Sequence, residues 1–568
     1  MPERIPARSS PVCEPARSPA PRRARRPVPA GVCALLLVAK LAAQGGLPPI
    51  PVPPENPITE EKRVLGKLLF WEEQLSSNNL MACGTCHRPG SGGGDPRRQP
   101  SPGLDGTLGT PDDNFASPGV IRSDSANHYE SDPAFGLQPQ VTRRATPSFI
   151  LGAWFPRLSW DGRFPGSFRD PLSQALLIAS GAALEDQALK PILDVIEMGH
   201  AGRTWSEVTN KLAAVRPMAL ASQVPADLSA ALANGARYPE LFAAAFGDPA
   251  ITPSRIAYAL ATYERTLIPD QTPWDRFQRG EPGAMTPNQI AGMNVFNGIG
   301  RCNLCHVPGL FSDAQFRNLG LRPIAQDGGL AESSGDPADR GKFKVPSLRN
   351  VGLRPSFFHA GGLTGFNLVL NFYVAGGGTN RDNQDPLLQP LTLTPQQRGQ
   401  LTDFVTNALT DPRVAAETSP FDRPTLLSER VPAAGFLYGP GTAGSGNRVP
   451  QMLAEVPANL GNVDFRIGVG NARGGAPATL LLGLQAAPPG TQINGVNLHV
   501  ALGASPLLVN LPLGGATGQA GAGTATLAAP LPTDPALSGV VLFAQWLVWD
   551  LGAPAGVAAS RGAQLRFF

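Results

Sequence analysis

Two pentapeptides combine a pair of thiols with an imidazole at a spacing that suits covalent haem attachment. Each reads C-x-x-C-H, and together they supply Cys83, Cys86, His87, Cys302, Cys305 and His306. The two cysteines of such a motif form thioether bonds with one haem, and the adjacent histidine ligates its iron. A zinc site would need both cysteine pairs close together, and a redox dithiol would not explain the histidine that follows each pair. The sequence therefore predicts two covalently bound haem c groups.

Length, charge and composition narrow the class of protein. A chain of 568 residues has room for two to four domains. Its formal net charge of +3 is close to neutral, so no nucleic acid or other polyanion is expected as a partner. The 64 glycines and 60 prolines, with only 16% charged residues, are typical of a loop-rich exported protein.

The first 44 residues have the layout of an export signal. Four arginines between positions 22 and 26 precede a short apolar run at 34–39, and small residues follow at 42–43. The apolar run is too short to span a bilayer, although a retained anchor is the alternative. The remaining cysteines, Cys13 and Cys33, fall in this segment, so no structural disulfide is expected after its removal. We predict a periplasmic or secreted protein.

Helical patterns must position both motifs. Residues 60–75 carry apolar side chains at i,i+4 spacing just ahead of the first motif. Thr-Pro pairs, which typically begin a helix, occur at 252–253, 286–287 and 394–395, and the second leads toward Cys302. Residues 88–140 show little periodicity and are predicted to form a long surface loop.

Beyond residue 435 the composition changes and lysine disappears. Alternating apolar residues at 463–469 and 496–500, and an apolar run at 540–549, predict strands. No catalytic constellation is visible there, and His499 is expected to be structural. The predicted fold is mostly α, with a haem c domain at 45–275, a second at 276–430, and a small all-β, sandwich-like domain at 435–568.

Several short motifs between residues 55 and 425 occur in a recognisable order. They are LGKLLF at 65–70, RATPS at 144–148, WDGR at 160–163, Gln187 ten positions before Glu197, FKVPSLRN at 343–350 and FHAG at 358–361. In this order, around two C-x-x-C-H motifs, they resemble the bacterial di-haem cytochrome c peroxidase family, which includes the MauG branch. The resemblance does not extend to residues 435–568.

This resemblance implies roles for individual residues. His87 and His306 would be proximal iron ligands, with the first haem reacting with peroxide and the second relaying electrons. Glu197 would move a proton between the peroxide oxygens, and Gln187 would orient peroxide or water. Without the resemblance, Glu197 reads as an ordinary carboxylate at a helix end.

Trp160, by the same resemblance, would lie between the porphyrins and ease electron passage, although alone it reads as a core aromatic. Arg163 would be structural or bonded to a haem propionate. His359 would bond a propionate or help to couple the haems.

The second haem separates the branches of the family. Conventional members place a methionine ligand about fourteen positions after the Phe-His pair, where this chain has Tyr373 and no methionine between 294 and 451. The MauG branch uses tyrosine here, and a phenolate favours oxidised iron. The alternatives are a buried tyrosine beside an otherwise ligated iron, or His359 as the ligand.

Two features of the family are in doubt in this chain. The window 135–139, where conventional peroxidases carry a removable histidine, has none, so the first haem is open or is approached by His128 from the long loop. The family's calcium site uses an asparagine where this chain has Arg144, so a calcium ion is not supported by the sequence.

Three functions follow from these residues. The leading hypothesis is a peroxidase that reduces hydrogen peroxide to water with electrons from a small c-type cytochrome or cupredoxin, relayed from the second haem to the first. The alternative is a MauG-like enzyme that uses peroxide-derived high-valent haem to oxidise a protein or another large donor. The third is a non-catalytic di-haem electron carrier. Homodimer formation is left open.

Overall fold

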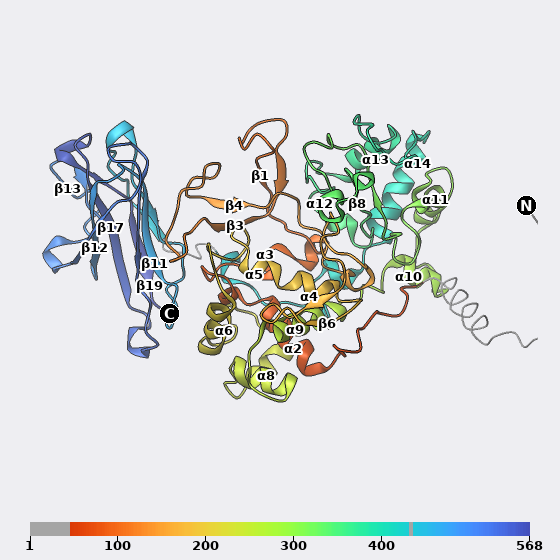
Figure 1. Ribbon diagram of the computed structural model, residues 1–568, viewed down its shortest axis with the longest axis horizontal. Helices are drawn as coiled ribbons and strands as arrows, with labels where there is room; N and C mark the ends of the chain where they lie inside the picture. The colour runs from red at the N-terminus through yellow and green to blue at the C-terminus, as the bar shows by residue number, and fades with distance from the viewer. Residues whose placement is uncertain (1–45, 431–435) are drawn as a thin grey trace, which may run out of the picture. The chain divides into compact units, whose positions relative to one another are not determined.

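The computed structural model describes residues 46–430 and 436–568 (Figure 1). The predicted export signal and its two cysteines lie outside the described residues. Within the described ranges, no helix has both the length and the apolar character that a bilayer crossing requires.

The helix that leads to the first motif packs on a second helix from the same half of the chain. Helix α2 (Glu60–Phe70) begins at Thr59, whose hydroxyl accepts the Lys62 N–H. It lies so close to α9 (Pro253–Arg265) that a Cβ on Gly66 would stand 1.9 Å from the carbonyl oxygen of Ala259. The helix predicted at 60–75 is shorter than expected: it ends at Phe70, and a 3₁₀ turn (Glu73–Leu75) follows.

Short helices complete the first haem-bearing half. They are α3 (Cys83–Cys86), α4 (Ala183–Ala188), α5 (Lys190–Leu193), α6 (Trp205–Ala214), α7 (Ala226–Leu232), α8 (Tyr238–Phe246) and, from the end of the haem-bearing part, α15 (Pro412–Ala415). After residue 411 the chain returns to this half, because Val414, Phe421 and Leu426 are buried in its core.

The second half repeats the arrangement around its own core. Its helices are α10 (Pro273–Gln278), whose Trp274 is buried in this core, α11 (Pro287–Asn297), α12 (Ala331–Ser334), α13 (Phe366–Val374), and α14 (Pro395–Asp403) with a π-helical turn at 404–408. The three predicted Thr-Pro helix starts are confirmed, since each threonine hydroxyl accepts a backbone N–H three residues ahead.

One backbone segment occurs twice with the same conformation, at residues 147–164 and 346–363. Both copies contain a short 3₁₀ helix, at Gly152–Trp154 and Val351–Leu353, and both contain one isolated bridge, Leu158 to Phe164 and Phe357 to Leu363. Positive φ angles recur at matching places, at Leu151, Ser159 and Gly162 and at Asn350, Phe358 and Gly361. Trp160 and His359 therefore occupy equivalent positions.

The prediction that residues 88–140 form a long surface loop is wrong. It contains two antiparallel pairs, β1 (Gln99–Ser101) with β2 (Asn114–Ala116), and β3 (Pro118–Ile121) with β4 (Pro139–Val141). Many of its side chains are buried by parts of the chain distant in sequence. Two further pairs, β5 (Phe168–Arg169) with β6 (Leu176–Ile178) and β7 (Phe316–Arg317) with β8 (Phe343–Lys344), lie elsewhere in the haem-bearing part.

The predicted β-rich region is confirmed at residues 436–568, drawn in blue in Figure 1. One sheet has the order β15-β12-β17-β19-β9, with β18 beside β17, and another has the order β10-β11-β16. Their bounds are β9 (Phe436–Tyr438), β10 (Gln451–Leu453), β11 (Arg466–Ala472), β12 (Pro477–Gly483), β15 (Leu507–Pro512), β16 (Gly523–Ala528), β17 (Val541–Trp549), β18 (Val557–Ala559) and β19 (Gly562–Arg566).

The two sheets share one core, in which Ile467, Leu480 and Trp546 are buried together. The strand predicted at 463–469 corresponds to β11, and the run at 540–549 to β17. Of the strand predicted at 496–500 only β14 (Val496–Asn497) forms, paired with β13 (Gln492–Ile493). His499 is buried and its Nε2 is bonded to the Pro440 carbonyl at 2.8 Å, in keeping with a structural role.

Candidate functional site

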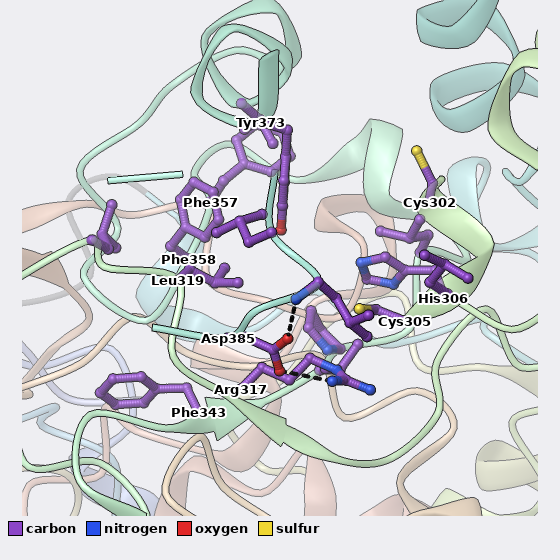
Figure 2. Close-up of a pocket in the computed structure, with 18 of the residues that line it drawn as sticks. Cys302, Cys305, His306, Arg317, Leu319, Phe343, Phe357, Phe358, Tyr373 and Asp385 are labelled. Atoms are coloured by element: carbon purple, nitrogen blue, oxygen red, sulfur yellow. Dashed lines mark hydrogen bonds and ion pairs between the residues drawn. The ribbon is translucent and has the colours of Figure 1, made fainter. Parts of the chain in front are cut away.

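A cavity opens beside the second C-x-x-C-H motif. Its walls are largely apolar and include Leu319, Phe357 and Phe358, with Cys302, Cys305 and His306 on one side. Figure 2 shows the hydroxyl of Tyr373 pointing into this cavity, across from His306. Tyr373 comes from α13, and burial raises the pKa of its hydroxyl well above the ordinary value. The structure therefore brings the predicted ligand pair of the second haem to one cavity.

Both motif histidines are oriented by a backbone carbonyl. The Nδ1 of His306 lies 3.0 Å from the carbonyl oxygen of Phe311, and the Nδ1 of His87 lies 3.2 Å from that of Gly93. A carbonyl oxygen only accepts, so Nδ1 carries the proton in each ring. Nε2 then keeps its lone pair for a metal. Burial also lowers the pKa of both histidines, which favours the neutral, ligating form.

Buried polar groups around the cavity lack partners in the protein. His359 lines the cavity, and its Nε2 is buried with no hydrogen-bond partner. Lys344 also lines it, is only 8% exposed, and has no carboxylate at ion-pair distance among the described residues. Its ammonium lies 3.9 Å from the centre of the Phe155 ring. Burial lowers the pKa of Lys344 to about 8.

A second cation without a paired carboxylate is Arg354, which is half-buried. It donates to the Thr146 carbonyl at 2.7 Å and forms no ion pair with another described residue. Burial lowers its pKa to about 10, and its charge acts on both Lys344 and His87. Buried cations are costly unless an anion accompanies them. The carboxylates of haem propionates are such anions, so the residues present fit two haem groups.

Trp160 lies at this same cavity. Its indole N–H donates to the Ala145 carbonyl at 2.7 Å, and its ring centre lies 6.4 Å from that of His359. His359 in turn stacks on Phe343 with ring centres 3.5 Å apart. The structure thus joins two of the predicted residues, Trp160 and His359, into one aromatic contact.

Glu197 is brought to the first motif from a distant part of the sequence. It follows α5 in a turn where the Asp194 carboxylate accepts the N–H of Glu197 at 3.1 Å. Its side chain is half-buried, and burial first, with a smaller effect of the charge of Glu197, raises the pKa of the Cys83 and Cys86 thiols. Burial first, and then the charge of Asp194, raise the pKa of Glu197 to about 7, while Arg163 opposes the shift. A carboxyl group with such a pKa can both accept and return a proton near neutral pH.

The other residues predicted for this site make few hydrogen bonds or ion pairs. Gln187 lies half-buried on α4, and its side-chain amide makes no hydrogen bond to another described residue. Arg163 is 53% exposed and lies 3.5 Å from the Asp161 carboxylate. The Nδ1 of His128 lies 3.6 Å from the Asp124 carboxylate. Their roles stay predictions.

Arg144 forms an ion-pair hub that the sequence did not indicate. Its guanidinium contacts Asp161 from the first half and both Asp327 and Glu332 from the second. The arginine is 8% exposed, and these carboxylates raise its pKa further. Across residues 46–430 and 436–568, no group of three or more histidine, cysteine or acidic side chains is arranged to hold a metal ion. The calcium ion remains without support.

Comparison with known proteins identifies the haem-bearing part. Residues 60–283 match the family described as di-haem cytochrome c peroxidase. Over these residues the chain is similar to that family. The chain is 28% identical to methylamine utilization protein MauG of Methylophilus methylotrophus over 385 residues, which cover 66% of this chain and 92% of the relative. It is 29% identical to cytochrome-c peroxidase IdrP1 of Denitromonas iodatirespirans over 431 residues, covering 70% and 93%.

A solved structure of a MauG-like protein associated with microbial copper homeostasis matches with a TM-score of 0.47 and 24% identity. The match covers 66% of this chain and 96% of that chain. As a di-haem cytochrome c peroxidase relative, the protein is an oxidoreductase of peroxidase or MauG type that carries two covalently bound haem c groups. Peroxide is its oxidising substrate and a redox protein its general class of electron donor.

Sequence reasoning missed Lys344, Arg354 and Arg144 as parts of the site. Lys344 stands between Phe343 and Val345, and a lysine inside an apolar motif is the signal that could have indicated it. Arg354 and Arg144 carried no such signal, because their importance comes from burial that only the fold creates.

Proposed function

We propose that this protein is an exported di-haem peroxidase that reduces hydrogen peroxide to water with electrons passed from the second haem to the first. The observation that carries the proposal is the carboxyl group of Glu197 beside the first motif, with a pKa of about 7. A pure electron carrier needs no proton-transfer group at a haem, so Glu197 favours an enzyme over a carrier.

The reaction consumes one peroxide, two protons and two electrons, and releases two waters. Haem iron, when bound, supplies the site at which peroxide accepts electrons. Glu197 takes a proton from one peroxide oxygen and returns it to the other, which then leaves as water. The carboxyl group ends the cycle in its starting state. Gln187 orients the peroxide or a water beside it.

Three groups hold the haem propionates in this proposal. Lys344 and Arg354 supply two positive charges that form no ion pair with another described residue, and His359 supplies an unpartnered Nε2. Arg163, exposed at the edge of the first site, binds a propionate or neutralises Glu197. Trp160, in contact with His359, carries electrons between the two pockets.

One observation favours the MauG-like mode as the second candidate function. The Tyr373 hydroxyl points into the cavity across from His306, where a phenolate ligand would stabilise oxidised iron. In that mode the same two haems and Glu197 use peroxide to oxidise a protein or another large donor instead of receiving electrons from a small one.

The remaining finer points belong to the same proposal. We assign the protein to the periplasm or the exterior, with a small c-type cytochrome or cupredoxin as donor and with domains at 45–275, 276–430 and 435–568. The first haem has an open face, since the ring of His128 is held beside Asp124.

Adding peroxide to the fully oxidised and to the half-reduced protein separates these functions. Turnover that requires prior reduction of the second haem supports the conventional peroxidase. Rapid spectral change in the fully oxidised protein supports the MauG-like mode. Absence of reaction in both states would leave only electron transfer and overturn the proposal.

A further inference from the structure

The C-terminal β module, residues 436–568, packs against a hairpin that belongs to the haem-bearing part. This hairpin comprises residues 118–141, that is β3, β4 and the segment between them. The hydroxyl of Tyr129 donates to Glu455 at 2.5 Å, and the Tyr129 N–H donates to the Thr526 hydroxyl at 2.9 Å. The guanidinium of Arg466 lies over the Tyr129 ring, 4.6 Å from its centre. Tyr129 is only 3% exposed, so the hairpin is anchored at this residue.

Strand β11 of the module is shaped to receive the hairpin. Its inward residues, such as Ile467 and Val469, are buried in the module core, and glycines alternate with them on the other face. A Cβ on Gly468 would stand 2.4 Å from the Tyr129 ring, and one on Gly470 would stand 1.8 Å from a Leu137 methyl group. Both hairpin side chains therefore insert where the strand has no side chain of its own.

The same hairpin supports the backbone that carries Glu197. The N–H of Val120 donates to the Ile196 carbonyl at 2.9 Å, and the Gln140 side-chain amide donates to the Val195 carbonyl at 2.8 Å. A Cβ on Gly119 would stand 1.8 Å from the Ile196 carbonyl oxygen. The hairpin backbone is thus in direct contact with the two residues that precede Glu197.

We propose that the β module is a positioning device for Glu197, which acts by fixing the 118–141 hairpin against residues 195–197. In this arrangement Tyr129 and Leu137 are the anchors, and Gly119 and Gln140 are positioning residues. The catalytic meaning of the device rests on the proposed function of Glu197, whereas the mechanical coupling does not.

The hairpin needs such an external support. Its two strands pair at only two positions, Pro118 with Val141 and Ile121 with Pro139, with an irregular register between them. A two-stranded hairpin of this kind is marginal by itself in water. Its buried cluster, formed by Ile121, Tyr129, Leu137 and Leu453, includes a residue from the module. The order of the hairpin therefore depends on the module.

Filling the space that receives Leu137 tests the proposal in the full-length, haem-loaded protein. Gly470→Val should displace Leu137, just before β4, and amide hydrogen exchange of the segment containing Val120 should quicken by about tenfold or more. Gly503→Val is the matched control in the same module, because no heavy atom lies within 4 Å of a Cβ at that position. Unchanged exchange in a folded Gly470→Val protein would overturn the proposal.

The pH profile of the peroxide reaction provides a readout that a purely structural role would not change. The charged groups that face Glu197, Asp194 and Arg163, are untouched by these variants. A looser, wetter Glu197 site should move the apparent pKa from near 7 toward the ordinary carboxyl range. An unchanged profile together with faster exchange would overturn the link to Glu197.

A milder variant covers the case in which Gly470→Val does not fold. Tyr129→Phe keeps the ring and removes only the hydroxyl bonded to Glu455, with Tyr438→Phe, elsewhere in the module, as its control. Faster exchange of the Val120 segment in Tyr129→Phe alone supports the coupling. If Glu197→Gln leaves the peroxide reaction unchanged while exchange still quickens, the proposed function fails and the coupling stands.

Discussion

Trp160 and His359 occupy equivalent positions in the two copies of the repeated backbone segment, and their rings pack edge to face. Their ring centres are 6.4 Å apart and their planes are inclined by 64°. Each residue is buried, and each comes from a different haem-bearing half. The two halves therefore contact each other at equivalent positions of the repeated backbone segment, beside the cavity of the second motif.

Replacing Trp160 should slow electron passage between the haems. In Trp160→Phe the smaller ring retreats from His359, and we expect transfer to slow by about tenfold, equivalent to about 1.4 kcal/mol of barrier. Rapid-mixing absorption measurements after partial reduction would follow it. Trp154→Phe is the control, since that indole donates to the Pro48 carbonyl and does not line the cavity. Equal rates in Trp160→Phe and the wild type would exclude the relay.

Glu197→Gln should slow the peroxide reaction by about two to four orders of magnitude, the range of a lost general acid–base group. Both haems should stay attached. Because burial and Asp194 raise the pKa of Glu197 to about 7, the carboxylate that accepts the proton is scarce below that pH. The wild-type rate should therefore rise through pH 7 and level above it, and the variant should lose this dependence.

Glu61→Gln, an exposed change on α2, should keep both the wild-type rate and its pH profile. A Glu197→Gln protein with the same rate as this control would remove Glu197 from the mechanism.

Tyr373→Phe should change the ferric absorption and electron paramagnetic resonance spectra of the second haem only. The variant keeps the ring in the cavity and removes the oxygen that faces His306. If Tyr373 ligates the iron when haem is bound, its loss alters the spin state of that iron. Tyr438→Phe in the β module should leave the spectra unaltered. Identical spectra for Tyr373→Phe and wild type would show that another group, or none, completes the second site.

Lys344→Met should lower the reduction potential of the second haem. A nearby positive charge stabilises the reduced form, and one unit charge at about 10 Å with an effective dielectric constant of about 20 amounts to about 1.7 kcal/mol. Potentiometric titration would measure the change. Lys342→Met is the control, because Lys342 is partly exposed and already paired with Asp339 at 3.3 Å. Equal potentials in the two variants would argue against Lys344 as a propionate partner.

Arg144→Ala should destabilise the protein by about 3–5 kcal/mol, since two buried carboxylates lose their buried cation and keep only the more exposed Arg143 and Arg163, each at 3.5 Å. Asp161 and Asp327 would then repel each other across the two halves. Denaturant titration of the holoprotein would measure this loss. Arg143→Ala removes a side chain that is 49% exposed and should cost at most about 1 kcal/mol. Similar losses of stability in both variants would contradict the role of Arg144 as the centre of this ion-pair cluster.

Local chemistry explains what could be predicted from the sequence. The Thr-Pro helix starts were correct because an N-cap and the residue after it act within one turn. The C-x-x-C-H motifs were informative because haem attachment needs only five adjacent residues. The strand at β11 was visible as an alternation, since its inward residues serve one local core.

Contacts between distant residues explain what could not be predicted. The 88–140 segment read as a surface loop because the groups that bury Tyr129, namely Glu455, Arg466 and Thr526, lie far along the chain. The alternation at 463–469 predicts a strand but does not reveal that its other face is covered too, where Arg466 is 3% exposed. Nor could any spacing reveal that Trp160 and His359 meet.

The glycine pair on β11 limits how the module can be transplanted. Gly468 and Gly470 leave room for the ring of Tyr129 and the methyl groups of Leu137. A protein engineer who grafts residues 436–568 onto another peroxidase must therefore move the 118–141 hairpin as well. The two segments are one exchangeable unit, although most of the chain separates them in the gene.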